Sequence, residues 1–79
     1  MFAILNRNDL PELAENLLGS MSVLARLEDR KHNLEVTVRG RNDYFFVYTV
    51  AVSEVLTMGA LQAHMCAFSN CLETEGFID

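Results

Sequence analysis

The most regular pattern of apolar and polar positions begins near residue 9. At about 100° per residue, the apolar side chains fall within one arc of about 140° on a helical wheel, while Glu12 and Glu15 fall opposite them. Asp9 at the N-cap and Pro11 in the first turn are typical of a helix start. The pattern predicts a helix over residues 9–27, with this apolar stripe: Leu10, Leu13, Ala14, Leu17, Leu18, Met21, Leu24 and Ala25.

A second pattern overlaps the end of this segment. Met21, Val23, Ala25 and Leu27 alternate along the chain as in a strand, and residues 20–23 have poor helix propensity. The helical stripe nevertheless continues in register past Gly19, which lies on the polar face. We therefore favour helix over strand for residues 20–27.

The other elements follow from shorter patterns. Residues 2–6 are predicted to form a short strand. Alternation predicts a strand over 33–40, and a β-branched and aromatic run predicts another over 44–52, with turn residues 40–43 joining them as a hairpin. Ser53 and Glu54 can cap a final helix over 53–72, and an acidic tail covers 73–79. The predicted fold class is α+β: a single two-layer domain over 1–79 in β-α-β-β-α order, whose antiparallel, hairpin-containing sheet is packed by two helices.

The final helix carries two different apolar faces. Its large side chains form an ordinary core stripe of Met58, Leu61, Met65, Phe68 and Leu72. The opposite side, where charges are expected, has mainly small residues, and this small-residue ridge would allow close helix packing. The ridge either packs on the first helix or forms an interface with a partner, and we favour a homodimer, the commonest soluble oligomer. The interface candidates are Leu56, Gly59, Ala60, Ala63 and Ala67.

Composition narrows the classes of partner. The chain has 79 residues, 51% of them hydrophobic, and a formal net charge of −5. That charge repels phosphates and anionic lipids, so we expect a protein partner with a basic surface and no membrane partner. The acidic side chains that would face this partner are Glu12, Glu15, Glu73, Glu75 and Asp79.

A single-stranded nucleic-acid binder is the alternative. The hairpin's polar face would be basic and aromatic if the third strand turned Tyr44, Phe46 and Tyr48 to the same side. The bases of a single strand can stack on such a face. The basic residues available to this alternative are Arg26, Arg30, Lys31, Arg39 and Arg41.

No pattern in the sequence indicates catalysis. The four glycines are isolated, and His32 and His64 have no metal-ligand spacing with the cysteines. We expect Cys66 and Cys71 to be small buried hydrophobes in a reducing cytoplasm. The charge-free stretch from Val55 to Leu72 contains too many polar residues for a membrane span. The sequence therefore predicts a cytoplasmic non-enzyme without metal or cofactor.

These features favour an interaction protein that binds and regulates or inhibits another protein. Small size, acidity and absence of catalytic motifs are similar in kind to inhibitors carried by phages and mobile elements, including anti-CRISPR proteins that act on nucleic-acid-binding complexes. This likeness involves no motif and implies no role for any residue. A structural subunit of a larger assembly is the remaining alternative.

Overall fold

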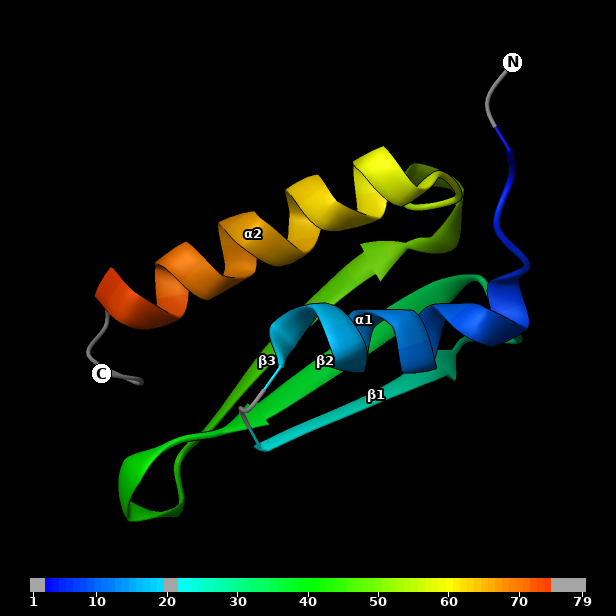
Figure 1. Ribbon diagram of the computed structural model, residues 1–79. Helices are drawn as coiled ribbons and strands as arrows, with labels where there is room; N and C mark the ends of the chain where they lie inside the picture. The colour runs from blue at the N-terminus through cyan, green and yellow to red at the C-terminus, as the bar shows by residue number, and fades with distance from the viewer. Residues whose placement is uncertain (1–2, 20–21, 75–79) are drawn as a thin grey trace.

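The computed structural model describes residues 3–19 and 22–74. Its elements run in the order α-β-β-β-α (Figure 1). Short 3-10 turns lie at Arg7–Asp9, Arg41–Asp43 and Val52–Glu54. The helices and strands are α1 (Leu10–Leu18), β1 (Ser22–Glu28), β2 (Asn33–Arg39), β3 (Phe45–Ala51) and α2 (Met58–Thr74).

The three strands form one antiparallel sheet in the order β1-β2-β3. Leu24 of β1 pairs with Thr37 of β2, which pairs in turn with Val47 of β3. Both helices lie on one face of this sheet, α1 beside β1 and β2 and α2 above β3 (Figure 1). Alternation along β2 places Leu34, Val36 and Val38 under the helices, and these three side chains are 0% exposed.

The core lies between the sheet and the two helices. Leu61, Met65, Phe68 and Leu72 are buried on α2, so four of the five predicted stripe residues are confirmed, while Met58 is 36% exposed. Leu10, Ala14 and Leu18 of α1 are buried as well. Each fully buried large apolar side chain stabilises the fold by about 1.5–3 kcal/mol relative to an exposed one.

The predicted start of α1 is right in position but wrong in its cap. Pro11 lies in the first turn, whereas the Asp9 side chain makes no capping hydrogen bond. Asn6 caps the preceding 3-10 turn instead, because its side-chain oxygen accepts a hydrogen bond of 2.9 Å from the Asn8 N–H. Gly19 ends the helix, with φ 70° and its N–H bonded to the Glu15 carbonyl. Glycine adopts this left-handed conformation without the Cβ strain of other residues.

Two predicted elements are wrong and together change the element order. The helix predicted over 9–27 ends at Leu18, and residues 22–28 form β1, as the alternation of Val23, Ala25 and Leu27 indicates. Residues 20 and 21 lie outside the described residues. The strand predicted over 2–6 is not formed by residues 3–6, and residue 2 is not described. The Leu5 N–H donates a hydrogen bond to the Leu56 carbonyl, but among the described residues this contact does not extend into a ladder.

The last helix begins later and ends later than predicted. Val52–Glu54 form a 3-10 turn, and α2 starts at Met58 rather than at residue 53. The Thr57 hydroxyl, not that of Ser53, accepts the capping hydrogen bond. The donor is the Ala60 N–H, and the bond is 3.2 Å long. The helix continues to Thr74, so the first two residues of the predicted tail are helical.

Candidate interaction surfaces

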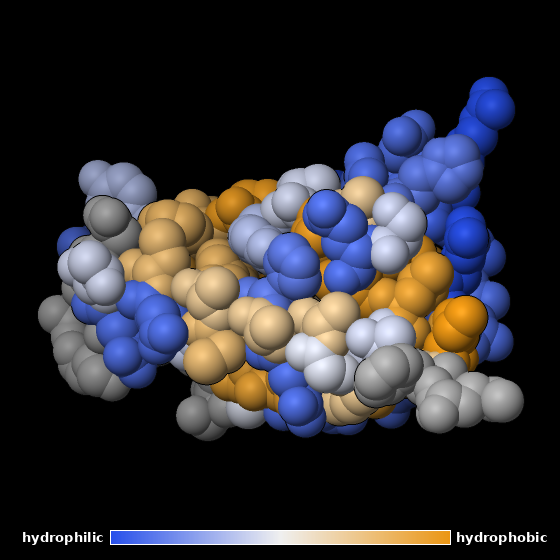
Figure 2. Space-filling model, turned by 90° about the horizontal axis from the view of Figure 1, so that it is seen from above, coloured by the Kyte–Doolittle hydropathy of each residue, from blue (hydrophilic) through white to orange (hydrophobic). Residues whose placement is uncertain are grey.

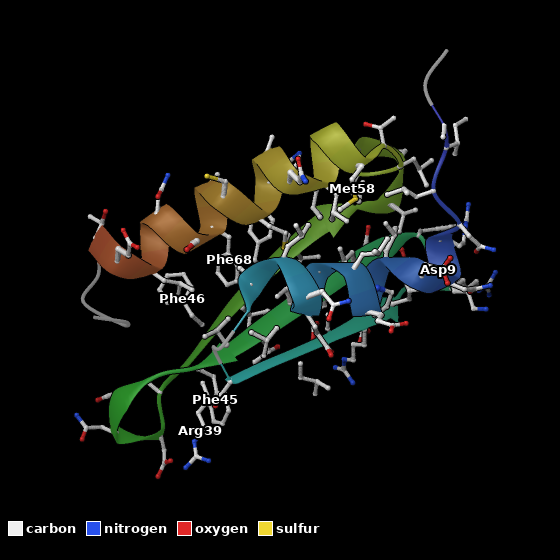
Figure 3. The ribbon with its side chains drawn as sticks, viewed as in Figure 1. Asp9, Arg39, Phe45, Phe46, Met58 and Phe68 are labelled. Carbon is white, nitrogen blue, oxygen red and sulfur yellow. The ribbon has the colours of Figure 1, made fainter. Side chains whose placement is uncertain are left out.

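The face of the sheet opposite the helices is covered by no described helix or strand, and it carries exposed apolar side chains. Leu24 is 63% exposed, Phe45 63% and Val47 53%. Thr37 lies between Leu24 and Val47 in the register, so the three form a row across the sheet. Beside this row is a shallow depression of about 280 Å³, lined by Ser22, Val23, Leu24, Thr37, Arg39 and Phe45. Phe45 and Arg39 lie together at the hairpin end of the sheet (Figure 3). We call Leu24, Thr37, Phe45 and Val47 the open-face patch.

Ion pairs flank the open-face patch on both sides. Arg39 is paired with Asp43 in the β2–β3 turn. Towards the other end, Arg26 lies 2.7 Å from the Glu28 carboxylate and 3.1 Å from that of Glu35. Exposed pairs of this kind contribute little to stability, but each arginine has a carboxylate that would compete with a phosphate.

The other predicted basic residues lie in the turns at the two ends of the sheet. Arg30 and Lys31 lie in the β1–β2 turn, and Arg41 lies in the β2–β3 turn. Strands of seven residues at about 3.3 Å per residue separate these two turns by roughly 20 Å. The Lys31 ammonium also donates a hydrogen bond to the Asn8 side chain. The basic residues are therefore divided between the two ends of the sheet.

The aromatic platform proposed for nucleic-acid binding is not formed on the open face. Phe46 and Tyr48 face α2, where their rings lie 6.1 and 5.2 Å from the Phe68 ring. Figure 3 shows Phe46 and Phe68 facing one another between β3 and α2. The register pairs Thr37 with Val47, so the odd-numbered residues of β3 share the face of Thr37 and Arg39. Tyr44 is 67% exposed and precedes β3.

Tyr48 makes a polar contact at the edge of the core. Its hydroxyl lies 2.5 Å from Nδ1 of His64 on α2, and the rings are tilted with centroids 6.1 Å apart. The hydroxyl donates this hydrogen bond when Nδ1 carries no proton. Burial raises the pKa of Tyr48 above its ordinary value of 10.0, and the negative charge of Glu54 raises it further. The contact ties α2 to β3 through the flank of the helix that carries His64.

The small-residue ridge of α2 is exposed to solvent. Gly59, Ala63 and Ala67 are exposed, and Leu56 and Ala60 are half-buried. A Cβ added to Gly59 would meet no atom within 4 Å. The depression between α1 and α2 is lined by other residues, among them Leu17, Gln62 and Ser69. Packing of the ridge on the first helix is therefore not observed. Seen from above, orange apolar side chains are spread over this side of the molecule among blue polar ones, and the blue ones predominate at the upper right (Figure 2).

The predicted acidic contact residues have different environments. Glu12 and Glu73 are exposed on α1 and α2. Glu15 is half-buried, and its carboxylate accepts a hydrogen bond of 2.9 Å from the Ala25 N–H of β1. Glu15 therefore has a structural role that its position on the polar face of the helix did not reveal. Glu75 and Asp79 lie outside the described residues.

Other features bear on chemistry and on location. Cys66 and Cys71 are exposed thiols, so the prediction that they are buried is wrong. Within residues 3–19 and 22–74, no group of three or more histidine, cysteine or acidic side chains could hold a metal ion. Across the same residues, every helix is too short or too polar to cross a membrane.

Comparisons with protein-family models, curated proteins and solved structures found no match for this chain.

Sequence reasoning missed the open-face patch. Val47 and Phe45 belong to a strand that was recognised as apolar on both faces, but Leu24 was placed in the helical stripe. The signal that could have found it is the alternation through residues 21–27. With that segment as a strand, Leu24 falls on the face opposite Val23 and Ala25.

Proposed function

We propose that this protein is a protein-binding domain that docks another protein on the open-face patch. The observation that carries the proposal is the exposure of Leu24, Phe45 and Val47 on a sheet face that no described element covers. Apolar side chains grouped on one face and rimmed by charges are typical of interaction surfaces. The flanking ion pairs supply the polar rim.

The charge of the chain supports a partner with a basic surface. The net charge is −5, and long-range attraction to a basic protein would raise the association rate. In this proposal the partner is regulated or inhibited by having its basic surface covered. The exposed thiols Cys66 and Cys71 fit a reducing compartment, so we place the activity in the cytoplasm.

The experiment compares matched surface variants. The tagged protein and its variants are used to capture partners from the cells that make it, and each protein recovered is then purified and titrated directly. Leu24→Ser is the test variant. Ile4→Ser is the control, because Ile4 is 75% exposed but lies in the segment before α1.

The expected result is selective loss of affinity. Burying the exposed part of one leucine contributes about 1–2 kcal/mol, so Leu24→Ser should weaken binding by about 5- to 30-fold and Ile4→Ser should not. Equal affinity for both variants would refute docking on the open-face patch. Recovery of nucleic acid in place of protein, with affinity that falls steeply with salt, would favour the nucleic-acid alternative.

A further inference from the structure

The two edge strands of the sheet expose different sets of backbone groups. The Gly40 N–H donates a hydrogen bond to the Tyr44 carbonyl, and the Val52 N–H donates one to the His32 carbonyl. Each bond is 2.8 Å long, and the two lie just before and just after β3. Hydrogen-bonded pairs alternate along an antiparallel ladder. The even-numbered residues of β3 therefore bond β2, and the N–H and C=O groups that point away from the sheet belong to Phe45, Val47, Thr49 and Ala51.

Among the described residues, side chains protect the β1 edge but not the β3 edge. At β1 the same alternation directs the Ala25 N–H outward, and the Glu15 carboxylate accepts it. The charged side chains of Arg26 and Glu28 also oppose pairing of β1 with another strand. By contrast β3, with the sequence FFVYTVA, has no charge, proline or glycine. Long uncharged edges of this kind are templates for pairing with another strand.

We propose that the edge of β3 pairs antiparallel with β3 of a second copy of this chain, which joins two three-stranded sheets across a two-fold axis. One register satisfies every outward N–H and C=O group of both strands. In it Phe45 pairs with Ala51 of the second copy, and Val47 with Thr49. Tyr48 then lies opposite Tyr48 of the second copy, at the two-fold axis. We call this arrangement the β3 edge pair.

The distribution of charge favours a second copy of this chain as the partner of the β3 edge. The chain carries −5 overall, so two copies repel each other through most of their surfaces. Residues 44–53 and 55–72 contain no charged side chain, however, and these segments form β3 and most of α2. A basic partner gains no attraction at this edge, whereas an identical neutral strand meets no repulsion there. A two-fold axis also lets one surface serve both partners.

The flank of α2 above β3 leaves room for the second copy. Paired strands lie about 4.8 Å apart, so the α2 helices of the two copies must approach closely. On the helical wheel, Ala60 and Ala67 fall within about 60° of His64, which bonds Tyr48 of β3. The side of α2 next to the edge thus carries small side chains, which permit close helix contact.

The first test removes one edge donor from each copy. Thr49→Pro deletes an outward N–H that β2 does not use, and proline is tolerated at such edge positions. Thr49→Val is the control, because it keeps the N–H and the strand propensity. Light scattering and sedimentation across a dilution series should give twice the 8.9 kDa chain mass for the parent and the control. Thr49→Pro should weaken the dimer roughly ten- to hundredfold.

Circular dichroism establishes whether Thr49→Pro still folds. If it does not, Thr49→Lys serves instead, since an edge lysine leaves the N–H in place and adds a charge that opposes pairing. A parent protein that stays at the mass of one chain throughout the series overturns the proposal. So does a parent dimer that both edge variants leave intact. Neither outcome decides docking on the open-face patch. Phe45 and Val47 of that patch belong to β3, but the docking is tested separately by Leu24→Ser on the opposite edge strand.

The second test checks the register. In a chain with Cys66→Ser and Cys71→Ser, Tyr48→Cys places two thiols face to face at the axis, at a spacing suited to a disulfide. Mild oxidation should then give a covalent dimer. Phe46→Cys, on the same face of the same strand, lies opposite residue 50 of the second copy and should not cross-link. Efficient cross-linking at 46 and none at 48 overturns the proposed register. Cross-linking at neither position, or pairing only with a strand of another protein, overturns the edge pair.

Discussion

The hydrogen bond from the Ala25 N–H to Glu15 can be tested by removing its acceptor. Glu15→Ala leaves a backbone donor at the β1 edge without its 2.9 Å partner. Ala25 is only 7% exposed, so water replaces the carboxylate poorly. The expected result is a loss of stability together with a less protected β1 edge.

The magnitude follows from the type of bond. A hydrogen bond to a charged group contributes about 1.5–3 kcal/mol, and the half-buried position of Glu15 reduces this to about 1–2 kcal/mol. Alanine regains a few tenths of a kcal/mol in helix propensity. The net loss should be about 1–1.5 kcal/mol, which lowers the Tm of a domain of this size by about 4–12 °C.

The assay is urea unfolding followed by circular dichroism, with an unchanged slope as the sign that both states keep their compactness. Glu12→Ala is the control, since Glu12 is an exposed acid on the same helix and should change the free energy of unfolding by at most about 0.5 kcal/mol. Glu15→Gln keeps an acceptor oxygen and should lose about half as much as Glu15→Ala. If Glu15→Ala and Glu12→Ala are equally stable, the structural role of Glu15 is refuted.

Three further predictions concern the β1–β2 turn, the buried tyrosine and the α2 ridge. Arg30 has φ 55°, so Arg30→Gly should raise the free energy of unfolding by about 1 kcal/mol, measured by thermal denaturation, and a lower Tm would contradict this. The pKa of Tyr48 is raised on folding, so its contribution to the free energy of unfolding is fully present below pH 10. This contribution falls above pH 10, because the Tyr48 hydroxyl loses its proton more readily in the unfolded chain. Tyr48→Phe should show a smaller alkaline loss in urea titrations. Ala63 is exposed and lies about 100° from His64 around the helix, so Ala63→Leu should leave stability within about 0.5 kcal/mol and the β3 edge pair intact. A folded monomer of that variant would instead assign a dimer to the ridge.

The hairpin could be predicted from the sequence because two signals agreed. Alternation in β2 and turn residues 40–43 predicted a pair of strands, and β2 (Asn33–Arg39) and β3 (Phe45–Ala51) confirm it. The orientation of β3 could not be predicted, since the strand is apolar on both faces and a shift of one residue exchanges them. The register of Thr37 with Val47, together with the ring contacts to Phe68, shows that Phe46 and Tyr48 lie under α2.

The end of α1 at Leu18 explains the error over residues 20–27. The predicted first helix was long enough to run beside most of α2, but α1 has nine residues against seventeen in α2. At 1.5 Å per residue it is roughly 12 Å too short to cover the second helix. Gly19 ends α1, and the segment after it is used as β1, which widens the sheet and places Leu24 on the uncovered face. The end of α1 therefore leaves Leu24 exposed on the open-face patch, while the small-residue ridge is exposed on the outer side of α2, away from the flank that faces α1. Both surfaces carry exposed apolar side chains among the described residues, and this exposure supports the interaction function that we propose.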